Sequence, residues 1–143
     1  LTEAGANFSR VLETGTLILS NSGYGCGVPK ILQITGCAND GIAAFLNLSS
    51  RCLPLFLYYY LRDNILNLRL KVARGNDQPN LNTDMLCGFS AVLPVLAEQR
   101  AISDKLWAVD QRISQEKEYI EKQGVLKCGL MNTLLSHQGL GEQ

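Results

Sequence analysis

The sequence predicts an α+β fold: a small mixed domain over residues 1–94, a long C-terminal coiled-coil helix over residues 95–136, and a tail over residues 137–143. Two observations lead to this division. All four prolines and most of the 13 glycines lie before residue 95, where short apolar runs alternate with turn residues. After Pro94 there is no further proline, and apolar residues recur with heptad spacing.

The mixed domain is expected to contain several short strands. Strand-like runs occur at Thr16–Leu19 and at Lys30–Thr35, and Gly36 is expected to close the second run. Between the two runs, Asn21–Gly27 is typical of a glycine-rich loop. A further short strand is expected near Ser90–Leu93. These elements predict a small, turn-rich domain.

The run Leu53–Leu70 is long enough for a helix. Pro54 suits the first turn, and leucine and isoleucine follow at spacings of four, four and three. Three consecutive tyrosines occupy positions 58–60. They cannot form one base-stacking platform, because consecutive helical residues point in different directions. We expect at least one in the core and the others half-buried. A turn-rich loop over Arg74–Asn80 follows.

The helix predicted over Val95–Ser136 carries an apolar seam. Seven of its ten a and d positions are apolar, which favours a coiled coil over a solitary surface helix. A rod of about 60 Å is not stable alone with such a seam exposed, so we expect pairing with a second helix. The polar positions Glu116, Gln123 and Lys127 either set the register or, as we prefer, loosen the packing near Gly124. The pairing residues are expected to be Ile102, Leu106, Val109, Ile113, Ile120, Leu130 and Leu134.

Composition excludes several classes of protein. The 143 residues are 46% hydrophobic and 18% charged, which is typical of a globular chain and not of a disordered or fibrous one. No apolar run reaches the ~18 residues that span a bilayer, and no signal peptide is visible. A net charge of zero argues against non-specific polyanion binding. Between Arg51 and Gly75, five basic residues face one acidic residue, which suits selective phosphate contact; an ordinary solvated face is the alternative.

Cysteine and histidine are too few and too scattered for a metal centre. The five cysteines, at positions 26, 37, 52, 87 and 128, form no C-x-x-C pair, and the one histidine is His137. No zinc set can be assembled at ordinary ligand spacing. We therefore expect reduced thiols that act as small hydrophobes, and neither a metal nor a cofactor. Cys26 with His137 is a conceivable nucleophile and base, but a frayed surface histidine is favoured.

Four short motifs occur in order along the chain. Gly15–Gly27 is similar to a G-D-x-L-x-S-x-x-G strand and loop, with Thr16 at the position where an acidic residue is common. Residues 75–81 match the order G-x-x-Q-x-N-L. A P-L-x-E-Q-x-x-I helix start is matched by Pro94, Leu96, Glu98, Gln99 and Ile102. A K-x-G-L-M-x-x-L-L close is matched by Lys127, Gly129, Leu130, Met131, Leu134 and Leu135. This ordered set resembles the type I restriction-modification specificity subunits and covers most of the chain.

The resemblance implies a target-recognition domain over residues 1–94, with its opening portion missing, and a spacer or dimerisation helix over residues 95–136. Such a domain reads one half of a bipartite double-stranded DNA target. Such a helix pairs antiparallel with a counterpart and docks methyltransferase subunits, which carry S-adenosylmethionine; restriction subunits join afterwards. We therefore expect a non-catalytic, cytoplasmic subunit, either a fragment or a half-subunit that pairs as a homodimer or with a second spacer helix.

DNA contacts are expected from polar and basic loop residues. Arginine can donate two hydrogen bonds to guanine, and asparagine or glutamine can pair with adenine, so such a loop can discriminate base edges. Lysine or arginine facing phosphate contributes affinity without sequence choice. The alternative is a polar turn without function. The candidate residues are Ser22, Gly23, Tyr24, Lys30, Arg69, Lys71, Arg74, Asn76, Gln78 and Asn80.

Two rival functions stay open. The first is a coiled-coil assembly module whose globular part binds protein, and it would show neither sequence preference nor salt-dependent binding on DNA. The second is a cysteine-dependent enzyme, which alkylation should inactivate. Catalytic signatures are otherwise scarce: the glycine-rich loop lacks the G-K-[ST] ending of a phosphate loop, and no N-P-P-Y methyltransferase motif occurs.

Overall fold

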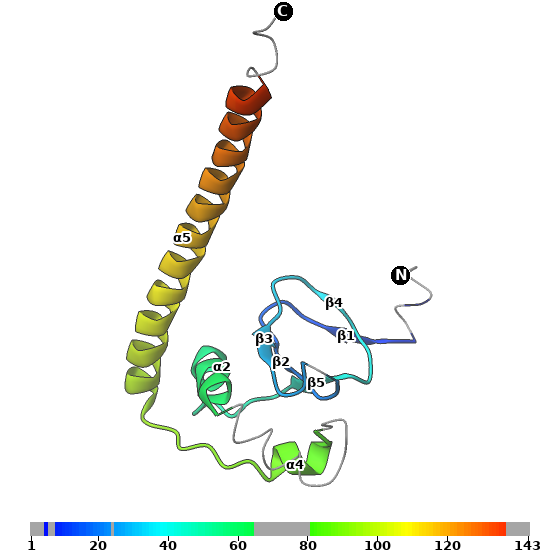
Figure 1. Cartoon of the computed structure of the whole chain (residues 1–143). Helices are drawn as coiled ribbons and strands as arrows, with labels where there is room; N and C mark the ends of the chain where they lie inside the picture. The colour runs from blue at the N-terminus through cyan, green and yellow to red at the C-terminus, as the bar shows by residue number, and fades with distance from the viewer. Residues whose placement is uncertain (1–4, 6–7, 24, 65–80, 137–143) are drawn as a thin grey trace, which may run out of the picture. The chain divides into compact units, whose positions relative to one another are not determined.

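The computed structural model describes residues 5, 8–23, 25–64 and 81–136 (Figure 1). Short strands come first and helices follow, so the predicted α+β class with a long C-terminal helix is confirmed. The chain divides into two compact units, Leu1–Ser103 and Asp104–Gln143. The elements are β1 Arg10–Leu12, β2 Leu17–Ser20, β3 Pro29–Ile31, β4 Gly36–Ala38, β5 Ile42–Phe45, α2 Pro54–Asp63, α4 Thr83–Cys87 and α5 Leu96–Ser136.

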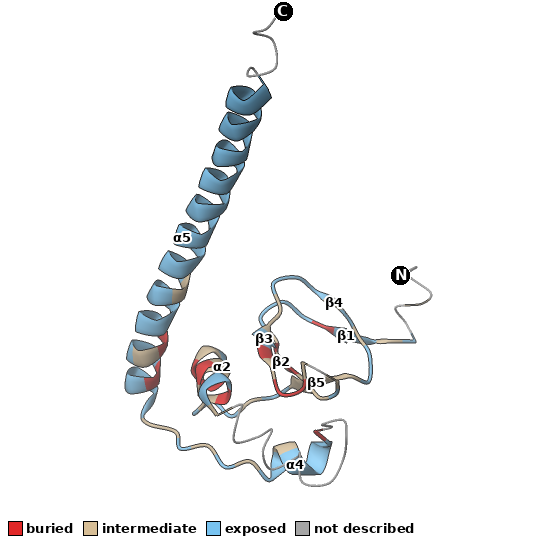
Figure 2. Cartoon of the chain, in the orientation of Figure 1, coloured by how far each residue is buried: buried red, intermediate tan, exposed pale blue. Residues whose placement is uncertain are grey.

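The strands form two small antiparallel sheets. β2 lies between β3 and β5 in one sheet, and β1 pairs with β4 in the other. Along β2, Leu17 and Leu19 are buried, whereas Ile18 and Ser20 are partly exposed (Figure 2). Because successive strand residues point to opposite faces, both leucines reach the core side of the sheet.

The strand predictions are right in one place and wrong in another. The run predicted at Thr16–Leu19 is β2, displaced by one residue. The run predicted at Lys30–Thr35 ends at Ile31, because β2 pairs with β3 only as far as the Leu17–Ile31 pair. Gly36 does not close that strand but begins β4, whose partner β1 comes from a distant part of the sequence.

The segment Ser90–Leu93, predicted to be a strand, is irregular. The Val92 amide donates to the hydroxyl oxygen of Tyr60 at 3.3 Å instead of joining a ladder. Ala91 packs against the hydrophobic core. A short apolar run becomes a strand only where a second strand can satisfy its backbone groups, and no strand pairs with this one among the described residues.

One hydrophobic core joins the three-stranded sheet to α2. Burial of each of its leucines contributes about 1.5–3 kcal/mol. Cys26 is part of this core, as expected of a thiol that acts as a small hydrophobe. That expectation is wrong for Cys37, Cys87 and Cys128, which are exposed. The buried core residues are Leu17, Leu19, Cys26, Leu57, Leu61 and Leu81.

α2 confirms the first part of the helix predicted over Leu53–Leu70. It begins at Pro54, which occupies the first turn as expected. It ends at Asp63, where both the backbone amide and the side-chain Nδ2 of Asn64 donate to the Tyr60 carbonyl oxygen, at 3.1 and 2.9 Å. Residues 65–70 of the predicted helix lie outside the described residues.

The three tyrosines of α2 point in different directions, as predicted. Tyr59 is buried, and Tyr58 and Tyr60 are partly exposed. The Tyr58 and Tyr59 rings meet edge to face, with centroids 4.9 Å apart. The Tyr60 ring instead lies 6.1 Å from that of Phe89. The tyrosines therefore serve packing, since they offer no common platform on which bases could stack.

Two further helices follow along the chain. α4, which the sequence did not predict, is capped by Asn82, whose Oδ1 accepts from the Met85 amide at 2.8 Å. α5 is 41 residues long and confirms the helix predicted over Val95–Ser136. It continues without a break through Gly124 and Gly129. Among the described helices, none combines the length and the apolar character needed to span a membrane.

Candidate nucleic-acid interface

The glycine-rich loop between β2 and β3 is a tight turn held by its own backbone. The Gly27 amide donates to the Ser20 carbonyl oxygen at 2.6 Å, and the Cys26 amide donates to Gly23 at 3.0 Å. Gly23 and Gly27 have φ angles of 73° and 82°, in the left-handed region that favours glycine. The Cys26 side chain is buried under the loop, whereas Ser22 is exposed. The loop therefore presents Ser22 to solvent.

A second turn, Asn39–Gly41, lies against this loop. The backbone amide of Asn21 donates to the Gly41 carbonyl oxygen at 3.0 Å, and its Nδ2 donates to the carbonyl oxygen of Asp40 at 2.8 Å. The Gly41 amide donates to the Asn39 Oδ1 at 3.1 Å. A Cβ atom at position 41 would lie 3.2 Å from the Ser22 Oγ and 3.3 Å from the Asn39 Oδ1, so a larger residue there would require these side chains to shift slightly. The two turns thus form one continuous surface.

Leu81, from a distant part of the chain, is hydrogen-bonded to the glycine-rich loop. Its amide donates to the Asn21 carbonyl oxygen at 2.7 Å, and its side chain is 1% exposed, within the core. Leu81 lies within the predicted DNA-contact segment, Arg69–Asn82, and directly follows Asn80, the last of the individual candidate residues. This end of the segment is therefore held at the glycine-rich loop.

Three of the predicted DNA-contact residues are described. Ser22 and Lys30 are exposed, Gly23 is partly exposed, and Lys30 pairs across the sheet with Ile18. The other candidates lie outside the described residues. They are Tyr24, Arg69, Lys71, Arg74, Asn76, Gln78 and Asn80.

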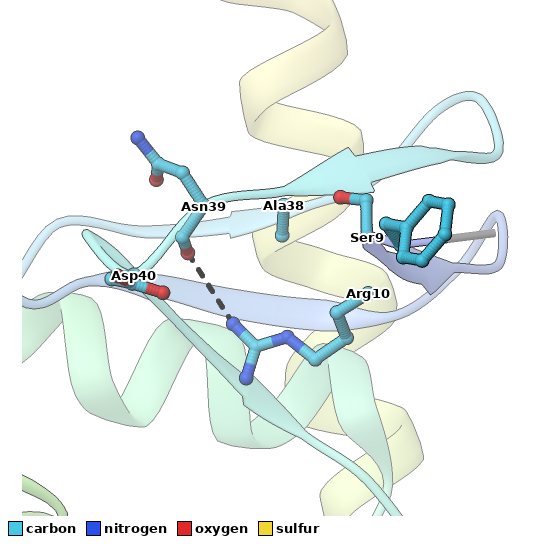
Figure 3. A pocket seen from close by; sticks show the side chains of 6 residues that line it. Ser9, Arg10, Ala38, Asn39 and Asp40 are labelled. Carbon is cyan, nitrogen blue, oxygen red and sulfur yellow. Dashed lines mark hydrogen bonds between the residues drawn. The ribbon is translucent and has the colours of Figure 1, made fainter. Parts of the chain in front are cut away.

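An open pocket of about 380 Å³ lies at the β1–β4 sheet (Figure 3). The Arg10 guanidinium enters it and donates to the carbonyl oxygens of Ile42 at 2.6 Å and of Asn39 at 3.4 Å. The Phe8 ring at its rim is 96% exposed. Arg10 was not identified from the sequence, because a single arginine before the first predicted strand belongs to no motif and no cluster of basic residues. The residues lining the pocket are Phe8, Ser9, Arg10, Ala38, Asn39 and Asp40.

The described residues offer little for acid–base or metal chemistry. Burial raises the pKa of the Cys52 thiol, which lowers its thiolate fraction and hence its nucleophilicity. No group of three or more histidine, cysteine, aspartate or glutamate side chains is placed to hold a metal ion in the part of the chain that is described.

The predicted pairing residues of α5 lie along its exposed surface. Leu106 is 40% exposed and Leu134 is 68% exposed, while Ile102 is partly buried. One ion pair along the helix, between Lys122 Nζ and Glu118 Oε1 at 2.7 Å, joins residues outside the seam. An apolar seam exposed over this length is the kind of surface that a second helix covers.

Comparison with known proteins agrees with the motifs. Residues 10–122 match the family described as "Type I restriction modification DNA specificity domain". The chain is also similar to the type I restriction enzyme MjaVIII specificity subunit of Methanocaldococcus jannaschii, with 29% identity over 136 residues. That similarity covers 88% of this chain and 31% of the subunit, so the chain spans about a third of the length of this curated relative.

Proposed function

The chain belongs to the type I restriction modification DNA specificity domain family, and on that premise we propose that it reads one half of a bipartite double-stranded DNA target without catalysing a reaction. In this proposal residues 1–94 form the target-recognition domain and residues 95–136 the spacer helix. The chain acts in the cytoplasm, within a complex that contains methyltransferase and restriction subunits. It needs no cofactor of its own, because the methyltransferase subunits supply S-adenosylmethionine.

The hydrogen bond from the Leu81 amide to the Asn21 carbonyl oxygen carries this proposal. It joins the chain position next to Asn80 to the loop that presents Ser22. This bond supports the proposal that two segments far apart in sequence contact DNA together, because it holds Leu81 beside the glycine-rich loop. A single surface is what a recognition domain needs, because base edges within a half-site are contiguous in one groove.

Charge and hydrogen-bonding capacity divide the proposed contacts into two kinds. Lys30 and Lys71 would face phosphate and supply affinity on any sequence. Gln78 and Asn80 would reach base edges, where an amide side chain can pair with adenine. The net charge of zero keeps the non-specific term small, so that discrimination depends on the base contacts.

The exposed seam of α5 supports the second part of the proposal. Residues such as Val109 and Ile120 would be covered by an antiparallel helix, either from a second copy or from a second spacer helix. The paired helices would then set the distance between half-sites and dock the methyltransferase subunits. The same exposed seam favours the alternative function, a protein-assembly module without DNA specificity.

Binding-site selection from random duplex DNA, with the chain and its methyltransferase partner together, separates these functions. We expect enrichment of a bipartite sequence whose binding weakens as salt is raised. An assembly module would enrich no sequence and would show no salt dependence on DNA. That result would contradict the proposed DNA recognition and would favour the alternative function, protein assembly through helix pairing.

Two substitutions then test the division of roles. Lys71→Ala should weaken binding equally on all sequences and reduce the slope of log affinity against log salt by about one. Gln78→Ala should cost about 1–3 kcal/mol on the selected site and relax the preference there. Lys117→Ala, at an exposed lysine of α5, is the matched control. If Gln78→Ala lowers the melting temperature but leaves relative preference unchanged, Gln78 supports the turn and does not touch a base.

A further inference from the structure

α5 begins with a buried glutamine, although this residue type is mostly exposed in proteins. Gln99 is 0% exposed, and both the oxygen and the nitrogen of its side-chain amide form hydrogen bonds. The Oε1 atom accepts a hydrogen bond from the Leu53 backbone amide at 2.9 Å. The Nε2 atom donates to the carbonyl oxygens of Arg51 at 2.8 Å and of Pro94 at 2.7 Å. One side chain thus binds backbone groups that precede α2 and α5.

These bonds complete the start of α2. The first backbone N–H groups of a helix find no partner inside it. Leu53 is the N-cap of α2 and offers no side-chain acceptor, and Pro54, the next residue, has no N–H. The Leu53 amide therefore needs an acceptor from elsewhere. Gln99 supplies it from 46 residues away in the sequence.

The burial of α5 is confined to its first two turns. One turn after Gln99, the Ser103 hydroxyl donates to the Gln99 carbonyl oxygen at 2.7 Å, and Ser103 is also buried. From Asp104 to Ser136 every residue is exposed except the partly buried Asp110. All the atoms of the Gln99 network belong to the compact unit Leu1–Ser103. Gln99 therefore anchors the start of α5 within that unit.

We propose that Gln99 is a positioning residue: it fixes the rotation and direction in which α5 starts, and so restricts the spacing between DNA half-sites that the assembled protein accepts. An apolar side chain of similar size could bury a similar area, but hydrophobic contact is non-directional. Three hydrogen bonds to backbone atoms impose a geometry on the helix. The consequence for DNA rests on the proposed function, whereas the restraint on α5 does not.

The restraint can be measured without DNA, by electron-spin distance measurements between labels on Cys37 and Cys128. Both thiols are exposed; Cys52 and Cys87 are replaced by serine in every sample, and Cys26 is buried and kept. An excess of unlabelled chain ensures that only distances within one chain are recorded. All measurements are made below the melting temperature of each variant.

Gln99→Met removes the three side-chain bonds and keeps the approximate size of the side chain. Gln111→Met, at an exposed glutamine of the same helix, is the matched control. We expect the distance distribution to become about twice as broad in Gln99→Met and to stay unchanged in Gln111→Met. An unchanged width in folded Gln99→Met, or equal broadening in both variants, overturns the proposal.

A second variant keeps the test decisive if Gln99→Met does not fold. Gln99→Glu retains an oxygen that accepts from the Leu53 amide but replaces the donor to Arg51 and Pro94 by an oxygen. We expect it to broaden the distribution as well, and an unchanged width in folded Gln99→Glu overturns the restraint.

The DNA consequence is tested on the duplex selected by the wild-type chain, with the half-sites moved apart or together by single base pairs. The wild-type chain should prefer the selected spacing, and Gln99→Met should lose that preference while still preferring the half-site sequences. A broadened distribution with an unchanged spacing preference overturns the DNA part. Absence of sequence-specific binding by the wild-type chain overturns the proposed function and leaves the distance result standing.

Discussion

If α5 pairs as proposed, replacing Leu106 and Ile113 together by aspartate should dissociate the two helices. Both residues occupy a positions of the α5 seam, and they are 40% and 45% exposed in the single chain. In a paired state these side chains would be covered by the second helix. A carboxylate at either position would have to lose its hydration when the helices meet.

The size of the effect follows from the exposed area. Complete burial of a leucine or isoleucine side chain stabilises by about 1.5–3 kcal/mol, so covering somewhat less than half of one contributes about 1 kcal/mol. Two positions on each of two helices therefore remove about 4 kcal/mol, before the cost of desolvating the carboxylates. A loss of about 4 kcal/mol weakens the dissociation constant by roughly a factor of 1,000.

Sedimentation velocity of the whole chain at several concentrations measures this change. The matched control is Ala108→Asp with Gln115→Asp, which introduces the same charges with the same spacing at exposed positions outside the seam. We expect the control to sediment like the wild-type chain and the seam variant to sediment as a monomer. The reasoning is refuted if the wild-type chain is already monomeric at every concentration, or if both variants dissociate equally.

Three further predictions concern the rest of the chain. Leu81→Ala should lower the free energy of unfolding by about 2–5 kcal/mol in urea titrations, whereas exposed Leu46→Ala should change it by less than about 0.5 kcal/mol; equal effects would contradict the core assignment. Because burial raises the pKa of Cys52, its alkylation at pH 8 should be slower than that of exposed Cys37, and the gap should narrow when the chain is denatured. The purified chain should show no nuclease, methyltransferase or ATPase activity, and methyl transfer to DNA by the chain alone would sink the proposed subunit role.

Most of the correct predictions came from regular patterns within short segments of the sequence. The start of α2 followed from Pro54 and the leucine spacing, since a proline in the first turn removes no helical hydrogen bond. β2 followed from an apolar run bounded by turn residues. The end of the Lys30 strand could not be predicted, because it depends on how far β2 extends beside it. The predicted DNA-contact residues from Arg69 to Asn80 lie outside the described residues, so their roles stay predictions.

The sequence by itself determined α5, because the hydrogen bonds of a helix join residues four apart. The heptad spacing of its apolar residues can therefore be recognised within one continuous segment. Only the tertiary structure decided which distant segments meet. Nothing near Gln99 in the sequence indicates that its amide binds Leu53, and nothing near Leu81 indicates that its amide binds Asn21. Both bonds satisfy backbone groups that are at least partly buried, and the partner of such a group is set by which segments the core brings together, not by the residues beside it in the chain.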